Sequence, residues 1–178
     1  MSETPAGSPT MTEAEMQEFA HQVFDTARHG DATMLERLLA NGLPPNLRNQ
    51  KGDTLLMLAS YHGHHDAARV LLGNGADANT RNDNGQSPLA GTGFKGDLRM
   101  AQLLIEHGAD VNAATPDGKT ALMMAAMFNR VDIVRLLLDN GADPFAQDLN
   151  GITALKAAVR MGAQDTPTLL AERMDARL

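Results

Sequence analysis

The stretch Asp117–Asp143, DGKTALMMAAMFNRVDIVRLLLDNGAD, reads as one complete helix–turn–helix unit. A turn glycine is followed by Thr120, a residue type that caps helix N-termini, and then by a short Ala- and Met-rich helix. A second helix carries apolar residues at i, i+3 and i+4 spacing, namely Ile133, Val134, Leu137 and Leu138. Asn140-Gly141 then supplies the left-handed residue that ends a helix. Because neither helix can bury its apolar face alone, the unit needs neighbours stacked on both sides.

The neighbours are visible as a period of 33 residues with no insertion or deletion. Two columns of glycines recur at this spacing: Gly42, Gly75, Gly108 and Gly141, and Gly52, Gly85, Gly118 and Gly151. Two more columns hold N-cap residues and core leucines: Thr54, Ser87, Thr120 and Thr153, and Leu56, Leu89, Leu122 and Leu155. A fixed period of this length predicts a solenoid of stacked repeats.

The segments NGADAN (74–79), HGADVN (107–112) and NGAD (140–143) resemble the signature with which an ankyrin repeat leaves its second helix and enters a β-turn. The resemblance covers about residues 12–178. It implies an all-α solenoid of helix–turn–helix units with β-hairpin-like turns, and a non-enzymatic protein that binds another protein. PLAGTGFKG (88–96) and ALMMAAMFNR (121–130) look like short bacterial ankyrin-repeat proteins.

The period also divides the chain. Residues 1–11, rich in Ser, Thr, Pro and Gly, are predicted to be a disordered leader. The remainder is predicted to be a single domain, divided into an N-terminal cap over 12–48, full repeats over 49–81, 82–114 and 115–147, and a closing repeat over 148–178. The cap is expected to hold an amphipathic helix over 12–28, capped by Thr12 with Glu15, and a second over 32–40. In the closing repeat, Asp165-Thr166-Pro167 is expected to cap a last helix whose water-facing side includes Arg177.

Two departures from the family pattern stand out. The histidine of the family's Thr-Pro-Leu-His motif is replaced in every repeat, by Met57, Ala90, Met123 and Lys156, which leaves open the hydrogen bonds that it makes between repeats. The first helix of the 82–114 repeat contains Gly91 and Gly93, each costing roughly 1 kcal/mol relative to alanine. That helix is predicted to be the weakest in the array, and Gly93→Ala to stabilise it by about 0.5–1 kcal/mol if the local φ is helical. Strong destabilisation would instead indicate a positive φ or the close approach of a neighbour.

Composition excludes several classes of function. The net charge is −7, with 15 basic residues scattered among 22 acidic ones, which disfavours a nucleic-acid-binding protein. The absence of cysteine excludes disulfides, thiolate catalysis and cysteine-based zinc sites. No signal peptide and no apolar run of membrane-spanning length is visible. We therefore expect a cytoplasmic monomer with no membrane association.

In the ankyrin family, partners are usually held on the concave side, by two positions of each first helix and by the turn tips. The matching helix positions predicted to bind a partner are Tyr61, His62, Phe94, Lys95, Met127, Phe128 and Arg160. Three of the six aromatic residues, Tyr61, Phe94 and Phe128, fall in this register, and aromatic residues and Met are enriched in interface cores. The alternative is that they fold back onto adjacent helices and widen the core.

The turn tips predicted to contribute are Lys51, Asp53, Gln86, Lys119, Leu149 and Ile152. The polar ones are ordinary turn formers and need no partner to explain them. Leu149 and Ile152 are apolar residues flanking an exposed turn, which has no local explanation.

Catalysis and metal binding find little support. His62-Gly63-His64-His65 is the only cluster that suggests a metal, and it resembles the Gly-His step between ankyrin helices. No nucleophile elbow, phosphate loop or pocketed carboxylate pair is recognisable, so no catalytic residue, metal or cofactor is predicted. An inhibitor or immunity-type protein that occludes the active site of one enzyme is the alternative to an adaptor, and a catalytic or metal-dependent module is the third hypothesis.

Overall fold

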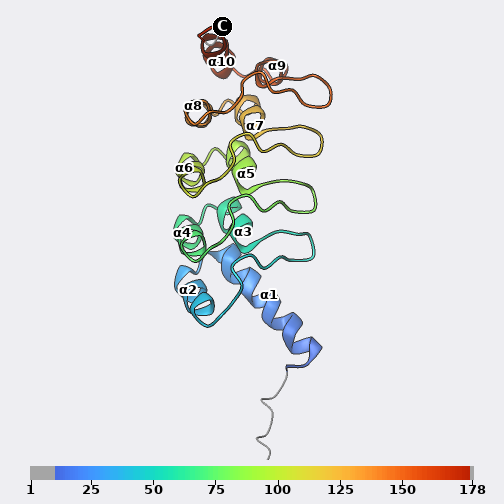
Figure 1. Ribbon diagram of the computed structural model, residues 1–178, viewed down its shortest axis with the longest axis vertical. Helices are drawn as coiled ribbons and strands as arrows, with labels where there is room; N and C mark the ends of the chain where they lie inside the picture. Colours follow the sequence, from blue (N-terminus) through green and yellow to red (C-terminus); the bar gives the residue numbers. More distant parts are fainter. Residues whose placement is uncertain (1–10, 177–178) are drawn as a thin grey trace, which may run out of the picture.

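The computed structural model describes residues 11–176, which form a two-layered stack of ten α-helices (Figure 1). Four hairpin arms project from the stack, formed by the segments 41–54, 74–87, 107–120 and 140–153. The helices are α1 (Glu13–His29), α2 (Ala32–Ala40), α3 (Leu55–Tyr61), α4 (His65–Gly73), α5 (Pro88–Lys95), α6 (Leu98–Glu106), α7 (Ala121–Met127), α8 (Val131–Asp139), α9 (Ala154–Arg160) and α10 (Thr166–Asp175). The odd-numbered helices from α3 to α9 form an inner layer beside the arms, and α2, α4, α6 and α8 form the outer layer. The predicted all-α repeat solenoid is confirmed.

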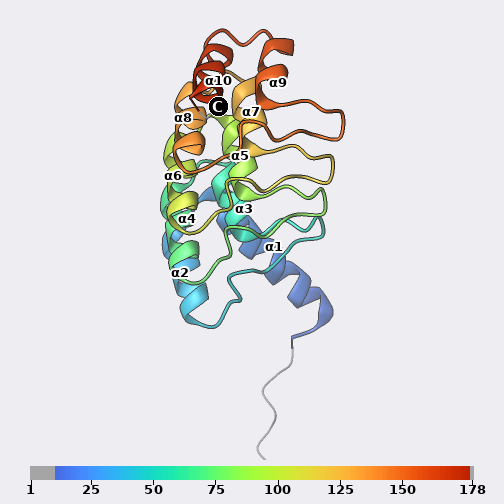
Figure 2. The same cartoon turned by 45° about the horizontal axis from the view of Figure 1, so that its top comes forward.

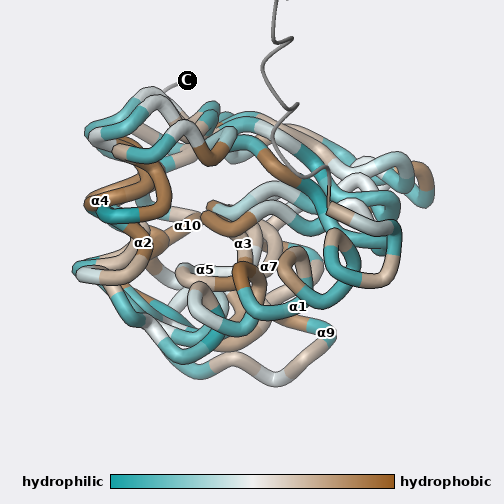
Figure 3. Tube along the Cα trace, turned by 90° about the horizontal axis from the view of Figure 1, so that it is seen from below, coloured by the Kyte–Doolittle hydropathy of each residue, from teal (hydrophilic) through white to brown (hydrophobic). Residues whose placement is uncertain are grey.

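One apolar cluster runs the length of the stack, from Val23 in α1 to Leu170 in α10. Figure 3, which views the stack from below, shows apolar segments concentrated in the helices. The core leucines Leu56, Leu89 and Leu122 are fully buried, whereas Leu155 is only partly buried. Within residues 11–176, no helix is long and apolar enough to cross a bilayer.

Each inner helix from α3 to α9 begins at the predicted hydroxyl. The side chains of Thr54, Ser87, Thr120 and Thr153 accept a hydrogen bond from the backbone N–H three residues later, over 3.2, 3.4, 3.3 and 3.3 Å. These four residues are buried, so each cap satisfies a helix N–H that water does not reach. The predicted N-cap column is confirmed.

A ladder of asparagines, which the sequence reading overlooked, ties successive repeats together. The side-chain amide N–H of Asn79 donates to the backbone carbonyl of Gly108 over 2.8 Å, and its oxygen accepts from the backbone N–H of Asp110 over 2.7 Å. Asn46 and Asn112 make the same pair of bonds to their own following repeats. Asn46, Asn79 and Asn112 are 33 residues apart, so the repeat pattern could have revealed them. The next position of this column holds Phe145, and no Gly-Ala-Asp segment follows it to receive the bonds.

Helix α1 is longer than the other inner helices, and its first half occupies the 33-residue columns that form an arm in later repeats. Its start is capped as predicted: Thr12 Oγ1 accepts from the Glu15 N–H, and Glu15 accepts from the Thr12 N–H over 2.7 Å. Only its second half is packed, through Val23, Phe24 and Ala27. The large apolar side chains of the first half, Met16 and Phe19, are exposed, because no repeat within residues 11–176 covers them.

Two local details differ from expectation. Asp165 is the N-cap residue of α10 and Pro167 lies in the first turn, as expected, but the Asp165 side chain makes no capping hydrogen bond, because its carboxylate accepts from Asn129 Nδ2 over 2.9 Å. Gly93 lies in a formed helix, but a Cβ built there would lie 2.9 Å from the Ala121 backbone oxygen of α7. The expected stabilisation by Gly93→Ala therefore reverses. The proposed leader, apart from its last residue, and Arg177 lie outside the described residues.

Candidate protein-binding groove

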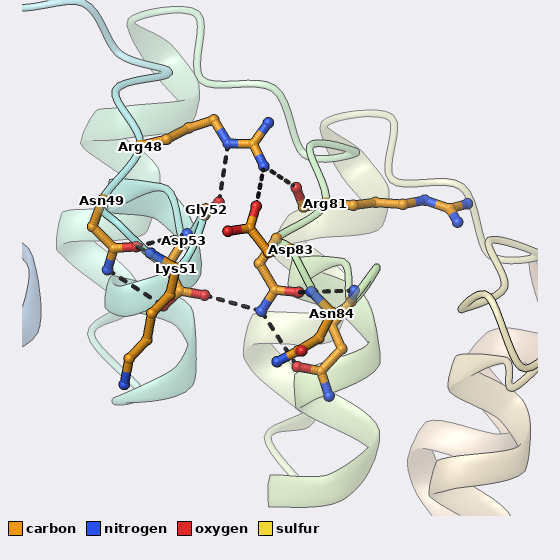
Figure 4. A network of polar contacts seen from close by, with 10 residues as sticks. Arg48, Asn49, Lys51, Gly52, Asp53, Arg81, Asp83 and Asn84 are labelled. Atoms are coloured by element: carbon orange, nitrogen blue, oxygen red, sulfur yellow. Dashed lines mark hydrogen bonds and ion pairs between the residues drawn. The ribbon is translucent and has the colours of Figure 1, made fainter.

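In three of the four hairpin arms, one polar side chain holds the turn at the tip in shape. Asn49 Oδ1 accepts from the backbone N–H groups of Lys51 and Asp53, both over 2.9 Å (Figure 4). Asn82 and Asp148 make the equivalent pairs of bonds in their own arms, over 2.8 to 3.1 Å. A single side-chain oxygen thus satisfies two backbone N–H donors. This matters because the pairing between the two sides of an arm is limited to isolated β-bridges, such as that between Arg48 and Thr54.

Bonds between neighbouring arms join them into a rim. Arg48 donates to the backbone oxygen of Gly52 over 3.2 Å, within its own arm, and to that of Arg81 over 2.9 Å, in the next. The backbone N–H of Asp83 donates to the Lys51 oxygen over 3.1 Å. The same backbone bond recurs at the other end of the stack, from Leu149 to Asp117 over 3.0 Å. In the middle of the stack the link is a hydrogen bond from Arg81 to the Ala114 backbone oxygen, because Pro116 has no N–H. Figures 1 and 2 show these arms on one side of the stack.

A groove of about 750 Å³ lies between this rim and the inner helices α3, α5 and α7. Seven of the residues predicted to bind a partner line it: Lys51, Asp53, Tyr61, His62, Gln86, Phe94 and Lys119. Its floor also includes Met57, Leu58, Ala90, Gly91 and Met124, which the sequence reading overlooked. Their signal was present, since these residues fall in two adjacent columns of the repeat, three and four positions before the Tyr61 column.

The other six predicted residues lie beside the groove or beyond it. Lys95 places its ammonium 4.1 Å from the centre of the Tyr61 ring. Phe128 meets Phe94 edge to face, with ring centres 4.9 Å apart, and Met127 is partly buried next to it. The remaining three, Arg160, Leu149 and Ile152, belong to the closing repeat and do not line the groove.

Sequence comparison agrees with this architecture. A family profile for ankyrin repeats, in three copies, matches residues 23–115 and 91–178. The chain belongs to the ankyrin-repeat family. A stretch of 55 residues is also 69% identical to PA3287, named as an ankyrin repeat protein, of Pseudomonas aeruginosa strain PAO1. That match spans 31% of this chain and 32% of the relative, about a third of each. Ankyrin repeats indicate a protein–protein interaction module, and the family is generally non-enzymatic.

The aromatic residues of this ankyrin stack are open to solvent to different degrees. Tyr61 is 48% exposed and Phe94 is 41% exposed, whereas Phe128 is partly buried behind Phe94. Gly91 leaves a hollow between them, because a Cβ there would touch only the Tyr61 ring, at 4.0 Å. The groove floor therefore offers two accessible rings with a small recess, of the kind that holds an apolar anchor side chain.

The charged side chains of the ankyrin arms are partly paired. The Asp117 carboxylate accepts from the Thr115 hydroxyl and forms an ion pair with Lys119 over 2.9 Å. These contacts, the hydroxyl first, hold the pKa of Asp117 below its usual value, and Asp117 raises the pKa of Lys119. The pKa of His62 is lowered, first by partial desolvation and then by the nearby charges of His64 and Lys95.

The histidines that suggested a metal have separate partners within the stack. His64 Nε2 lies 2.7 Å from the Arg28 backbone oxygen, which links the cap to the first full repeat. His65 Nε2 lies 2.9 Å from both oxygens of Asp97, in the next repeat. No cluster of three or more metal-ligating side chains occurs within residues 11–176. Both histidines therefore have a structural explanation, as contacts between neighbouring repeats.

Proposed function

We propose that the protein binds a partner protein in the groove between its arms and the inner helices. The observation that carries the proposal is an apolar floor, with Tyr61 and Phe94 half exposed in the free protein, framed by a polar rim. Exposed aromatic rings in a concave site are typical binding hot spots, because they bury a large area at a small cost in side-chain entropy. Phe128 supports Phe94 from behind, and Met127 extends the apolar surface towards the closing repeat.

The rim favours tight binding because it is already ordered. The bonds of Arg48 and Arg81 to the next arm, and the backbone bonds that join the first two and the last two arms, hold the arms in place before a partner arrives. The backbone at Lys51, Asp53, Gln86 and Lys119 is therefore fixed. Little conformational entropy is then lost on association. In the proposal these rim residues and His62 select the partner, while Lys95 extends the surface beside Tyr61. The other three predicted residues, Arg160, Leu149 and Ile152, extend it at the far end.

The test is affinity capture from a lysate of the source cells, with the double variant Tyr61→Ala/Phe94→Ala beside the wild type. Phe145→Ala is the matched control, because Phe145 is also 41% exposed but does not line the groove. We expect one or a few proteins to be retained by the wild type and by Phe145→Ala, and lost by the double variant. Circular dichroism should show that all three forms are equally folded.

Equal retention by the double variant would place binding elsewhere and refute the proposal. If the retained partner is an enzyme, its activity in the presence of the purified protein separates the two uses of the groove. Stoichiometric loss of activity indicates an inhibitor, and unchanged activity indicates an adaptor.

A further inference from the structure

The carboxylates that line the groove are already bonded within their own chain. Asp53 accepts from Asn82 Nδ2 over 3.0 Å through one oxygen and from Asn49 Nδ2 over 3.3 Å through the other. Asp117 accepts from the Thr115 hydroxyl and pairs with Lys119. A cationic group of a partner would have to compete with these contacts to reach either carboxylate.

The cations of the same surface have no such commitments. Lys51 at the first arm, Lys95 over the Tyr61 ring and Arg160 at the C-terminal end form no ion pair with any residue of 11–176. All three are exposed. Amide hydrogen bonds leave Asp53 charged, but these three unpaired cations outnumber this one unpaired carboxylate of the groove lining, although the chain as a whole carries −7.

We infer, resting on the function proposed above, that the groove accepts an acidic protein segment that also carries apolar side chains. An apolar side chain of the segment would occupy the recess at Gly91, between Tyr61 and Phe94. Carboxylates flanking it would pair with Lys95 and Lys51 without breaking any ion pair within residues 11–176. A basic segment would meet like charges and find Asp53 and Asp117 occupied, and such mismatches discriminate strongly between partners.

A nucleic acid would also bring negative charge, but it fits this surface less well. The three free cations are separated by aromatic and Met side chains, and the arms between them carry the carboxylates Asp53, Asp83 and Asp117. A phosphate backbone needs closely spaced cations along its path, and the net charge of −7 repels it. Isolated carboxylates on a protein segment suit separated cations better.

The experiment selects short random peptides displayed on phage against the full-length protein, and sequences those that bind the wild type but not Tyr61→Ala/Phe94→Ala. We expect these groove-dependent peptides to be enriched in Asp and Glu beside one or more large apolar residues. The best one, synthesised free, should lose at least about tenfold in affinity for Lys95→Glu. Arg135→Glu, which changes the net charge equally on the outer helix α8, should leave its affinity within about twofold. A peptide with Lys in place of its Glu should regain affinity for Lys95→Glu.

The possible failures are distinct. Groove-dependent peptides that are neutral or basic, or that bind Lys95→Glu and Arg135→Glu alike, overturn the acidic specificity and leave the groove as a binding site. Selection that yields no groove-dependent peptide overturns the proposed function itself. Displacement of the acidic peptide by a single-stranded oligonucleotide at equal concentration would show that the surface recognises phosphate, and this also overturns the inference.

Discussion

Gly93→Ala should lower the free energy of unfolding by up to about 2 kcal/mol, the overpacking cost less the gain in helix propensity. Helix propensity alone favours alanine at this position of α5 by about 1 kcal/mol. Against this, the added Cβ would lie 2.9 Å from the backbone oxygen of Ala121 and 3.1 Å from the backbone nitrogen of Ala125. Both atoms belong to the backbone of α7, which cannot turn aside as a side chain does. The two helices must separate, and overpacking of this kind costs about 1–3 kcal/mol.

Gly91→Ala is the matched control, since it makes the same change two residues earlier in the same helix. Its Cβ would meet nothing closer than the Tyr61 ring at 4.0 Å, an ordinary contact. Its φ is not in the left-handed region, so the helix-propensity gain is realised in full. We expect Gly91→Ala to raise the free energy of unfolding by about 0.5–1 kcal/mol.

Urea unfolding followed by circular dichroism measures both variants, and a shift of the midpoint at constant m-value reports the change in stability. The two changes should have opposite signs and differ by about 2 kcal/mol, the difference between the two estimates above. If Gly93→Ala is as stable as Gly91→Ala, α7 yields to the methyl group at little cost. The close approach of α5 and α7 would then not be the reason for glycine at position 93.

Three further predictions concern the joints between repeats and the groove. Asn79→Ala should lower the free energy of unfolding by about 1–2 kcal/mol, because it removes two hydrogen bonds to the next repeat. The loss should be larger than that of Asn74→Ala, because the Asn74 side chain bonds only to the helix that precedes it. Equal losses in urea unfolding would contradict the asparagine ladder. Partial desolvation lowers the pKa of His62 in the folded state from its ordinary value of 6.5, so the unfolded chain binds the proton more readily. The free energy of unfolding should therefore fall as the pH drops through 6.5. An NMR titration midpoint of His62 at or above 6.5 would refute this. Backbone amides of α5 should exchange with deuterium before those of α7, because α5 contains two glycines and α7 contains none, and the reverse order would contradict that ranking.

The elements that sequence alone predicted are those set by rules acting within a few residues. Thr120 caps α7 because its hydroxyl reaches the N–H three residues on, and Gly141 follows α8 because a positive φ is needed there. The 33-residue period repeats these local signals. A helix boundary that is ambiguous in one repeat can therefore be located from the matching positions of the other repeats. The capping box of Thr12 and Glu15 was predictable in the same way.

The missed features depend on distances between residues far apart in the chain. Asp165 looks like a helix cap, and only the stack shows that its carboxylate is bonded to Asn129, 36 residues earlier. Asn79 looks like an ordinary turn residue, so its bonds to the next repeat were not suspected, although its column was visible. Sequence gives the period of a column, but not what the column faces.

The same limit applies to the candidate site. The Tyr61 column could be placed on the concave side, but its members differ in their surroundings. Tyr61 and Phe94 line the groove, Met127 is partly buried and does not line it, and Arg160 lies in the closing repeat, beyond the groove. The depth of the groove depends on how the arms are positioned relative to α3, α5 and α7. The repeat pattern of the sequence does not contain this information.

The two glycines of α5 connect the fold to the groove. From the sequence, both glycines were expected to destabilise α5 in the same way. In the structure, Gly93 lies against the backbone of α7, whereas Gly91 lines the groove and leaves the recess beside Tyr61. The neighbouring repeats hold Leu58 and Met124 in the column of Gly91, so an ordinary side chain fits that position in this fold. Replacing Gly91 by Leu would fill the recess without disturbing the contact between α5 and α7. The variant should therefore stay folded and lose the partner, which would make the glycine a feature of recognition.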